Sequence, residues 1–464
     1  MKRVLFFLFA VFIAIAARSD DDENQIYIKV GEAAIKKSLI AIPPLVFLSS
    51  PGLAPNYKQL GSDLFNTLTN DLDVSNLFKT INANAFLEDT AKVGLTPAPA
   101  NPDGFHFDLW KKINAEFLIR AGYKMTGDDE FELETYIYYV PQAKLVLGKK
   151  YVAKIKDARR TAHTFADDLM KTLTGKDGIF RTKLVVASDR VGHNWKEIYV
   201  MDWDGRNETQ VTSHHSISLS PAWAPSGKTI SYTSFAYHPA LKRRNPDMFT
   251  YDLFEGKRFL VSSRTGINSG SVFSPNGDFI YLTISKGADP DIYRINLDGD
   301  DLIRLTNGPK GTLNVEPAIS PDGKKIAFSS DRSGGPMVYI MDSDGKNVKR
   351  ITFAGHYNSS PSFSPDGKRL AFAGRDRDHF DIFTVGVDGT DMKRLTSAKK
   401  TNGGWANNED PSFSPDGRHI AFTSNRTGKN QIFIISEDGT NEHRITVDNH
   451  NYYKPKWSPY FNKD

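Results

Sequence analysis

The sequence predicts a small α/β domain on the N-terminal side, followed by an all-β propeller of six blades. The first observation behind this prediction is a phrase of the PxFSPDGxxIAF type that recurs six times, at spacings of 44 to 50 residues. The second is the order of short β-favouring runs and turn residues inside each repeat. The third is the mixture of helical and strand periodicity before the repeats begin. Repetition with this period is typical of radially arranged, four-stranded units.

Residues 1–19 have the pattern of a secretory signal peptide. Two basic residues precede an apolar run over residues 4–17, and Ala14 and Ala16 fit the small residues of a cleavage site. The apolar run is too short to span a bilayer easily, which favours a signal peptide over a membrane anchor. An uncleaved anchor is the alternative. The chain has no cysteine, so the signal cannot be of the lipoprotein type and the fold cannot contain a disulfide. We therefore predict an exported protein.

Residues 20–178 are predicted to form the α/β domain. Four leucines recur every fourth residue from Leu60 to Leu72, which is typical of one face of a helix. A second amphipathic helix covers residues 158–173 and stops at Gly175, a residue type that often ends helices. Strand patterns cover residues 26–30, 37–48 (interrupted by two prolines), 115–125, 131–139 and 144–155. Helices and strands thus mix in one small α/β domain.

Each repeat contains four predicted strands, as the copy that starts at Pro317 illustrates. Ser-Pro-Asp-Gly at residues 320–323 reverses the chain between the first strand and the apolar run at 326–328. A third run at 338–341 leads into an Asp-Gly turn, and a fourth strand ends in Ile351-Thr352. Four antiparallel strands in each repeat predict one propeller blade.

The two ends of the repeat region complete each other. The last phrase begins at Pro455 and has only a first strand, whereas residues 183–212 have the patterns of the other three strands. A shared blade closes the ring and removes free sheet edges, so residues 182–464 are predicted to form six blades. One bulky residue recurs just before the turn of each repeat, and its predicted role is a wedge between neighbouring blades. These residues are Trp223, Phe273, Ile319, Phe363, Phe413 and Trp457.

The candidate site lies at one mouth of the central channel. We expect the residues just before each innermost strand to gather there. They are rich in asparagine and acidic side chains, which suits the capture of an extended peptide or a loop. A hydrated funnel is the alternative, and a Ca²⁺ ion held by the acidic groups is a further use of the same mouth. The candidate partner-binding residues are Asn268, Ser269, Asn314, Glu316, Asn358, Ser359, Glu409, Asp410 and Tyr453.

Enzymatic and nucleic-acid-binding functions find little support in the sequence. The net charge of +4 is small for a chain of 464 residues, whereas nucleic-acid binding requires a clustered basic patch. No Gly-x-Ser-x-Gly motif occurs, and no histidines have zinc-ligand spacing. We therefore predict no catalytic residue, no metal ligand, no cofactor and a monomer. An exported propeller enzyme or carbohydrate-processing protein, with the channel as its active site, is the alternative function.

The combination of these features resembles the TolB family, the periplasmic component of the Tol–Pal envelope system. A signal peptide, a small α/β domain and six PxFSPDGxxIAF repeats carry the resemblance, which covers nearly all of the mature chain. The joint between the domains is its most specific part, with His163-Thr164, Leu173-Thr174-Gly175 and Phe180-Arg181-Thr182 in the family's order. The repeat alone also occurs in propellers of prolyl-oligopeptidase-type peptidases. The final Trp457-Ser458-Pro459-Tyr460 also matches the family's last strand.

The resemblance implies a non-enzymatic scaffold in the periplasm, peripheral to the outer membrane through its partner. It implies that the propeller mouth binds a Pal-like outer-membrane lipoprotein. It also implies that an N-terminal arm with Ile26, Ile28 and Val30 meets a TolA-like inner-membrane protein. These contacts imply roles in outer-membrane integrity, envelope constriction during cell division and protein import. The chain departs from the family in its acidic run at residues 20–23 and in Ile267, where a polar residue is expected.

Overall fold

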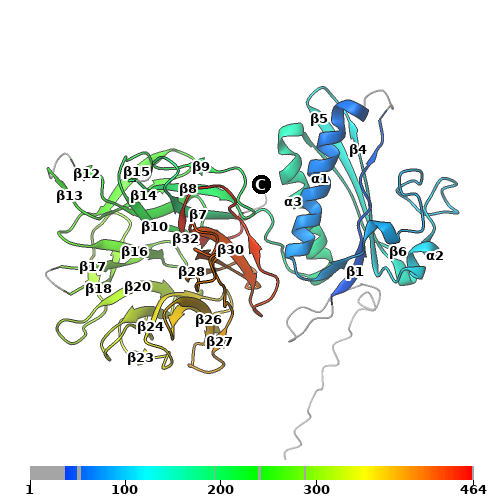
Figure 1. The fold of residues 1–464 in the computed structure, drawn as a ribbon. Coiled ribbons are helices and arrows are strands. Elements are labelled where there is room, and N and C mark those ends of the chain that lie inside the picture. The colour runs from blue at the N-terminus through cyan, green and yellow to red at the C-terminus, as the bar shows by residue number, and fades with distance from the viewer. Residues whose placement is uncertain (1–36, 50–53, 193, 239–241, 287–288, 462–464) are drawn as a thin grey trace, which may run out of the picture.

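The computed structural model describes residues 37–49, 54–192, 194–238, 242–286 and 289–461. Figure 1 shows two bodies, an N-terminal domain with two long helices beside a sheet and a propeller built of smaller sheets. The predicted signal peptide and the predicted strand at 26–30 lie outside the described residues, so both stay predictions.

The N-terminal domain is one mixed sheet with helices on both faces. Its strand order is β3-β1-β4-β5-β6, with β2 beside β4, and β1 and β2 pair in parallel with their neighbours. The helices are α1 (Ala54–Val74), α2 (Phe107–Lys112) and α3 (Ala158–Thr174), with three short 3-10 turns between the strands. The strands are β1 (Ser38–Ala41), β2 (Val46–Phe47), β3 (Phe78–Thr80), β4 (Phe117–Met125), β5 (Glu130–Tyr139) and β6 (Lys144–Lys154).

The long predicted elements of this domain are confirmed, and two short ones were not predicted. The predicted strand at 37–48 appears as β1 and β2 on either side of its two prolines. Helix α3 ends at Gly175, which has φ of 72° and donates its N–H to the carbonyl of Lys171 at 2.9 Å. The unpredicted elements are β3, with three residues, and α2, with six. Segments of this length are too short to show a periodic apolar pattern.

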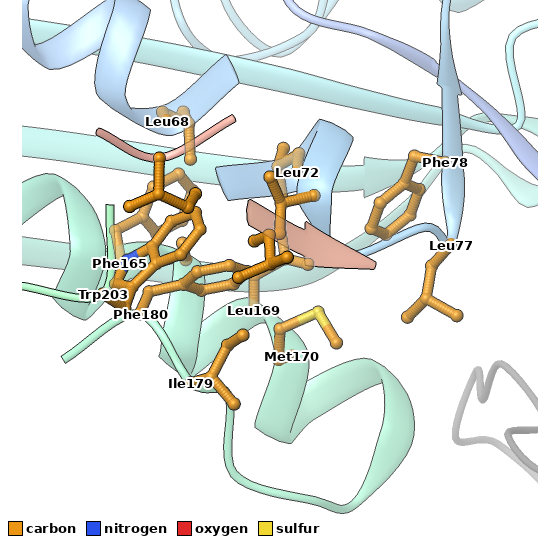
Figure 2. Packing of buried hydrophobic residues seen from close by; sticks show 14 of the residues in the cluster. Leu68, Leu72, Leu77, Phe78, Phe165, Leu169, Met170, Ile179, Phe180 and Trp203 are labelled. Carbon is orange, nitrogen blue, oxygen red and sulfur yellow. The ribbon is translucent and has the colours of Figure 1, made fainter. Parts of the chain in front are cut away.

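The core of the N-terminal domain continues into the propeller. Figure 2 shows Leu68 of α1 and Phe165 of α3 beside Phe180 and Trp203, which belong to the joint and to blade 6. The rings of Phe180 and Trp203 lie 5.5 Å apart, and Trp203 is fully buried. The same cluster includes Trp457 at the other end of the chain. Apolar burial therefore fixes the two bodies against each other.

The propeller consists of six four-stranded antiparallel sheets, as predicted. Blade 1 contains β10 (Ser218–Trp223), β11 (Thr229–Ser234), β14 (Asp247–Asp252) and β15 (Lys257–Ser262). Blade 2 contains β16 (Asn268–Phe273), β17 (Phe279–Ile284), β18 (Asp291–Asn296) and β19 (Ile303–Arg304). Blade 3 contains β20 (Asn314–Ile319), β21 (Lys325–Ser330), β22 (Met337–Asp342) and β23 (Lys349–Arg350).

Blade 4 contains β24 (Tyr357–Phe363), β25 (Arg369–Arg375), β26 (Phe380–Gly386) and β27 (Lys393–Arg394). Blade 5 contains β28 (Asn408–Phe413), β29 (His419–Ser424), β30 (Gln431–Ser436) and β31 (His443–Arg444). Blade 6 contains β32 (Tyr452–Trp457), β7 (Lys183–Ser188), β8 (Glu197–Asp202) and β9 (Thr209–Gln210). A small hairpin of β12 (Tyr237–His238) and β13 (Arg243–Arg244) extends from blade 1.

The two ends of the propeller sequence share blade 6, which confirms the predicted closure. Strand β32 pairs antiparallel with β7, and Tyr452 lies opposite Ser188 while Trp457 lies opposite Leu184. Beyond the paired segment, the N–H of Ser458 donates to the carbonyl of Lys183 at 2.9 Å. The innermost strand of the last blade therefore comes from the C-terminal tail, and the other three strands come from the start of the repeat region.

The Ser-Pro-Asp-Gly turn is stabilised by its own side chains. In blade 3 the N–H of Gly323 donates to the carbonyl of Ser320 at 2.8 Å, and Gly323 has φ of 72°. The hydroxyl of Ser320 donates to the Asp322 carboxylate at 2.6 Å and accepts the N–H of Lys325 at 2.9 Å. Serine and aspartate thus supply hydrogen bonds that stabilise the turn, and glycine adopts the left-handed conformation that the turn requires.

The bulky residues before these turns pack between blades, as predicted. Phe413 of blade 5 belongs to a cluster with Ala371 and Ile382 of blade 4. Trp223 of blade 1 donates its indole N–H to the carbonyl of Lys456 in blade 6 at 3.1 Å. These side chains therefore contribute to the contact between each innermost strand and the preceding blade.

The N-terminal domain docks on the end of the propeller that carries these turns. Arg418, in the turn of blade 5, donates to the carbonyl of Ser75 at 2.6 Å. The imidazole of His419 donates its Nε2–H to the carbonyl of Val74 at 2.9 Å. Both acceptors directly follow α1 or form its last residue. The first strands of all blades begin at the other end, so that end faces away from the N-terminal domain.

Candidate functional site

Six equivalent residues, one in each blade, form the wall of the channel at its free end. Each is the third residue of the first strand of its blade, or the fourth in blade 4, and strand pairing shifts there in all six blades. All have positive φ values between 49° and 64°. A bulge with a left-handed residue redirects the side chain out of the sheet. The residues are Ser220, Gly270, Glu316, Ser360, Asp410 and Lys454.

These six residues line one cavity of about 310 Å³. Its wall also contains Ser269 and Val315 of the innermost strands, and Ile267 and Tyr357 where the chain enters them. The candidate residues were expected just before the innermost strands. The structure corrects this placement, because they are the first residues of those strands.

A partly buried charge cluster connects blades 3 to 6 across the channel. The ammonium of Lys454 lies 3.0 Å from Oδ1 of Asp410 and 3.4 Å from Oε1 of Glu316. Glu316 also accepts the backbone N–H of Ser360 at 2.8 Å and its hydroxyl at 3.1 Å. Burial disfavours the charge on Lys454, but the two carboxylates outweigh this effect and raise its pKa. The two carboxylates therefore favour the charged form of the Lys454 ammonium.

Glu409 lies beside this cluster, and its surroundings disfavour its charge. Its side chain is partly buried, and burial together with the adjacent Asp410 carboxylate raises its pKa. Tyr453 is also partly buried, and the ammonium of Lys196 lies 5.1 Å from its ring centre. Ser359 precedes Ser360 in the bulge of blade 4 and is partly buried.

The three candidate asparagines are buried and do not face the opening. Asn268, Asn314 and Asn358 have exposed fractions of 2% or less. Asn314 donates to the Asp291 carboxylate at 2.9 Å, and Asn268 donates to the carbonyl of Arg264 at 2.6 Å. They hold the connections that enter the innermost strands. We predicted that these three side chains contact a partner. The structure corrects this prediction, because they are buried and have a structural role at the base of the mouth.

Lys454 and Lys456 are not among the candidate partner-binding residues predicted from the sequence, although Lys454 belongs to the segment expected at the mouth. Both lie on β32 and line the cavity with Glu316 and Asp410. Repeat alignment could have found them, because Lys454 occupies the same position as Glu316 and Asp410 in their own repeats. The alignment could not have predicted that these three charges meet, since they come from three different blades.

The described residues contain no group of three or more histidine, aspartate or glutamate side chains arranged to bind a metal ion. At the mouth, the ammonium of Lys454 lies between the carboxylates of Glu316 and Asp410. A cation is thus already built into the chain at the position where the acidic residues suggested Ca²⁺. Within the same described ranges, no helix has the length and apolar character to cross a membrane.

Comparison with known proteins identifies relatives of both bodies. The TolB beta propeller domain matches residues 170–403 and 357–463, and the TolB amino-terminal domain matches residues 26–146. The chain is 34% identical over 282 residues to the Tol-Pal system protein TolB of Desulfosudis oleivorans, which covers 60% of each chain. It is 34% identical over 239 residues to the protein TolB homolog of Chlorobium luteolum, which covers 51% of each chain. The aligned segments thus span less than two thirds of these curated relatives.

A solved structure resembles the whole arrangement. The crystal structure of TolB from Acinetobacter baumannii superposes with a TM-score of 0.74 at 25% sequence identity. The superposition covers 92% of this chain and 97% of that one. The order and number of domains are therefore shared along nearly the full length of both proteins.

Proposed function

This chain belongs to the TolB family, and on that premise we propose that it is a periplasmic scaffold of the Tol–Pal system that binds a Pal-like outer-membrane lipoprotein through its propeller mouth. Membership of this family agrees with the prediction that the chain is not an enzyme. The observation that carries the proposal is the cavity of about 310 Å³ at the end of the channel that faces away from the N-terminal domain.

The character of this cavity suits a protein segment better than a reacting substrate. Its wall combines apolar side chains such as Ile267 and Tyr357 with the hydroxyl of Ser269 and the charges around Lys454. Pockets of this mixed kind bind and orient a ligand. For the alternative enzyme, two carboxylates are the natural acid and base, but Glu316 and Asp410 are both engaged by one ammonium. The geometry thus favours binding.

We extend the proposal to a second partner at the N-terminal arm. The arm residues Ile26, Ile28 and Val30 lie outside the described residues, and a TolA-like inner-membrane protein is proposed for them from the family resemblance. The chain after the arm enters β1, where the N–H of Ser38 donates to the carbonyl of Leu77 at 2.9 Å. That carbonyl closely follows Val74 and Ser75, which contact the propeller. The described start of β1 thus lies close in the fold to the interdomain contact. Roles in outer-membrane integrity and cell division follow from such partners.

The experiment blocks the mouth without touching its charges. Ser269→Trp places a large ring into the cavity, and we expect binding of the soluble domain of the Pal-like lipoprotein from the same organism to weaken about tenfold or more, because the ring fills space that the ligand needs. Isothermal titration calorimetry measures the affinity. The matched control is Asn276→Trp, an exposed position in the turn at the opposite end of the same blade.

The control variant should bind as the wild type does, and all three proteins should share one melting temperature within a few degrees. A wild-type protein that does not bind the lipoprotein domain would remove the proposed function. Equal binding by Ser269→Trp and wild type would move the binding site away from the mouth.

A further inference from the structure

One lysine side chain in the channel wall has no ionic partner among the described residues. The side chain of Lys456 lines the cavity, and within the described part of the chain its ammonium makes no hydrogen bond or ion pair. At the same position of the other five blades, small or medium-sized residues occur, and none of them lines the cavity. These are Ala222, Val272, Ala318, Ser362 and Ser412. Blade 6 alone therefore brings a long cationic side chain to this level of the channel.

The nearby acidic groups are already used by Lys454. Glu316 and Asp410 are both within 3.4 Å of the Lys454 ammonium. Burial and the neighbouring charge of Lys454 lower the pKa of Lys456, and the pull of the two carboxylates is too weak to reverse this. Lys456 is only partly exposed to water, and a charge that is partly desolvated without gaining a partner is energetically unfavourable. A negatively charged group that enters the cavity would remove this cost.

Hydroxyl groups near the mouth can assist such a group. The side chains of Ser220 and Ser269 line the same cavity, and neither makes a hydrogen bond within the described ranges. Both can donate to a carboxylate oxygen. The cavity therefore offers one cation and two hydroxyl donors to an incoming ligand.

Apolar side chains surround one side of this opening. Each innermost strand has a buried polar residue at or near its start. In blades 1 to 4 the residue before it is large and apolar, with an exposed fraction of 37% to 41%. We call these four residues the apolar arc. They are Ile217, Ile267, Leu313 and Tyr357.

Blades 5 and 6 have asparagines at the positions of the apolar arc. Asn407 accepts the N–H of Phe380 at 3.1 Å, and Asn451 accepts the N–H of Asn430 at 2.9 Å. Their polar atoms are thus used within the propeller. The rim of the mouth therefore has an apolar sector on four blades and a polar sector on two.

We propose that the mouth recognises a loop of its partner protein that carries a carboxylate at its tip and apolar side chains beside it. The carboxylate enters the channel and pairs with Lys456, and the apolar side chains cover the apolar arc. This inference rests on the proposed function, because it specifies the chemistry of the segment that the mouth binds. The asymmetry of the rim would fix the direction in which the loop lies, since complementary charge and apolar sectors match in one orientation.

The first test replaces the cation with an uncharged side chain of similar length. Lys456→Met should weaken binding of the Pal-like lipoprotein domain about thirtyfold or more and should flatten the salt dependence of the affinity, because a buried ion pair is lost. Its melting temperature should stay equal or rise, since an unpaired buried charge is removed. The matched control is Lys324→Met, an exposed lysine in the turn of blade 3, which should bind as wild type does.

The outcomes separate this inference from the proposed function. If the wild type does not bind the lipoprotein domain, the proposed function fails. If the wild type binds and Lys456→Met binds equally well with the same salt dependence, the mouth is a binding site but the carboxylate inference is wrong. A lower melting temperature of Lys456→Met would assign the lysine a structural role and would also contradict the inference.

Two further measurements test the chemistry of the partner directly. In the Lys456→Glu variant, binding should be lost and should return when one acidic residue of the lipoprotein domain is changed to lysine. If changing each acidic residue of the lipoprotein domain to lysine in turn never restores binding, the ion pair is refuted. Leu313→Ser in the apolar arc should weaken binding about tenfold through lost apolar burial. Phe254→Ser, at a residue that is 76% exposed on the outer edge of blade 1, should leave binding unchanged. Equal effects of both variants would refute a role for the arc.

Discussion

Lys454 and Lys456 are two residues apart on one strand, yet their surroundings give them different chemistry. Lys454 occupies the bulge position and reaches carboxylates from blades 3 and 5. Lys456 lies beyond the bulge and has no such partner within the described residues. Consequently the pKa of Lys454 is raised, whereas that of Lys456 is lowered, chiefly by burial. The charge of Lys454 is thus used within the propeller, whereas the charge of Lys456, two residues further along the strand, is available to a ligand.

A second residue-scale feature lies between the two bodies. The Nδ1–H of His163 donates to the buried carboxylate of Asp71 at 2.8 Å. Burial raises the pKa of Asp71 to about 7, although His163 opposes this effect. Burial lowers the pKa of His163, but the carboxylates of Asp71 and Asp204 outweigh it, so the net direction is upward. Arg159, which pairs with Asp204, and Asp167 also face this pair.

We expect this pair to make stability depend on pH near neutrality. Both groups have higher pKa values in the folded state than their ordinary values of 3.8 and 6.5, so the folded protein binds more protons. Their stabilising contribution is complete below those ordinary values and is lost as pH rises through about 7. The free energy of unfolding should fall by about 1–2 kcal/mol between pH 6 and 8. Urea unfolding of wild type and Asp71→Asn at both pH values checks this; identical pH profiles would contradict it.

At the scale of the element, the innermost strand combines three tasks in six residues. Its first residue is buried and anchors the chain, its third residue turns into the channel, and its last residue packs against the preceding blade. In β28 these are Asn408, Asp410 and Phe413. The bulge makes this division feasible because it breaks the alternation of side chains along the strand.

The wedge residue of this strand should carry a large part of the stability of the blade contact. Phe413 is 7% exposed and packs against Ala371 and Ile382 of the neighbouring blade. Phe413→Ala should reduce the free energy of unfolding by about 3–5 kcal/mol through lost burial and the cavity left behind. Urea unfolding measures the change, with Phe254→Ala as the exposed control, which should change stability by about 0.5 kcal/mol or less. A loss below 1 kcal/mol for Phe413→Ala would be incompatible with a wedge.

At the scale of the whole molecule, the C-terminal tail connects every part of the structure. Strand β32 completes blade 6, Trp457 enters the core shared with the N-terminal domain, and Lys454 closes the charge cluster at the mouth. The hydroxyl of Tyr460 donates to the carbonyl of Asp177 in the joint at 3.1 Å. One segment therefore links ring closure, domain docking and the cavity at the mouth.

Deletion of Tyr453–Asp464 should abolish the cooperative melting transition of the propeller. The deletion removes most of β32, leaves the edge of β7 unpaired and takes Trp457 out of the core. Differential scanning calorimetry and near-ultraviolet circular dichroism measure the transition. Removal of residues 462–464 alone is the control and should retain it. A truncated protein that melts at the wild-type temperature would show that closure by the tail does not stabilise the ring.

Much of the fold was predictable because its determinants are local. The Ser-Pro-Asp-Gly turn uses only the residues of its own segment, as Ser320 and Asp322 show. Helices α1 and α3 are long enough to display their apolar faces, whereas β3 and α2 are too short. Ring closure was also predictable, since the first and last repeats are incomplete in complementary ways.

By itself, the sequence determined the six-bladed architecture, its closure by the tail and the end of the channel where the cavity lies, because turns and repeats depend on residues that are close in the sequence. Only the tertiary structure decided which side chains face the cavity. Asn268 and Asn314 are buried, whereas the bulge residues Glu316 and Lys454 line the cavity. Whether a charge is paired or available depends on neighbours from other blades, and spacing along one repeat does not contain that information.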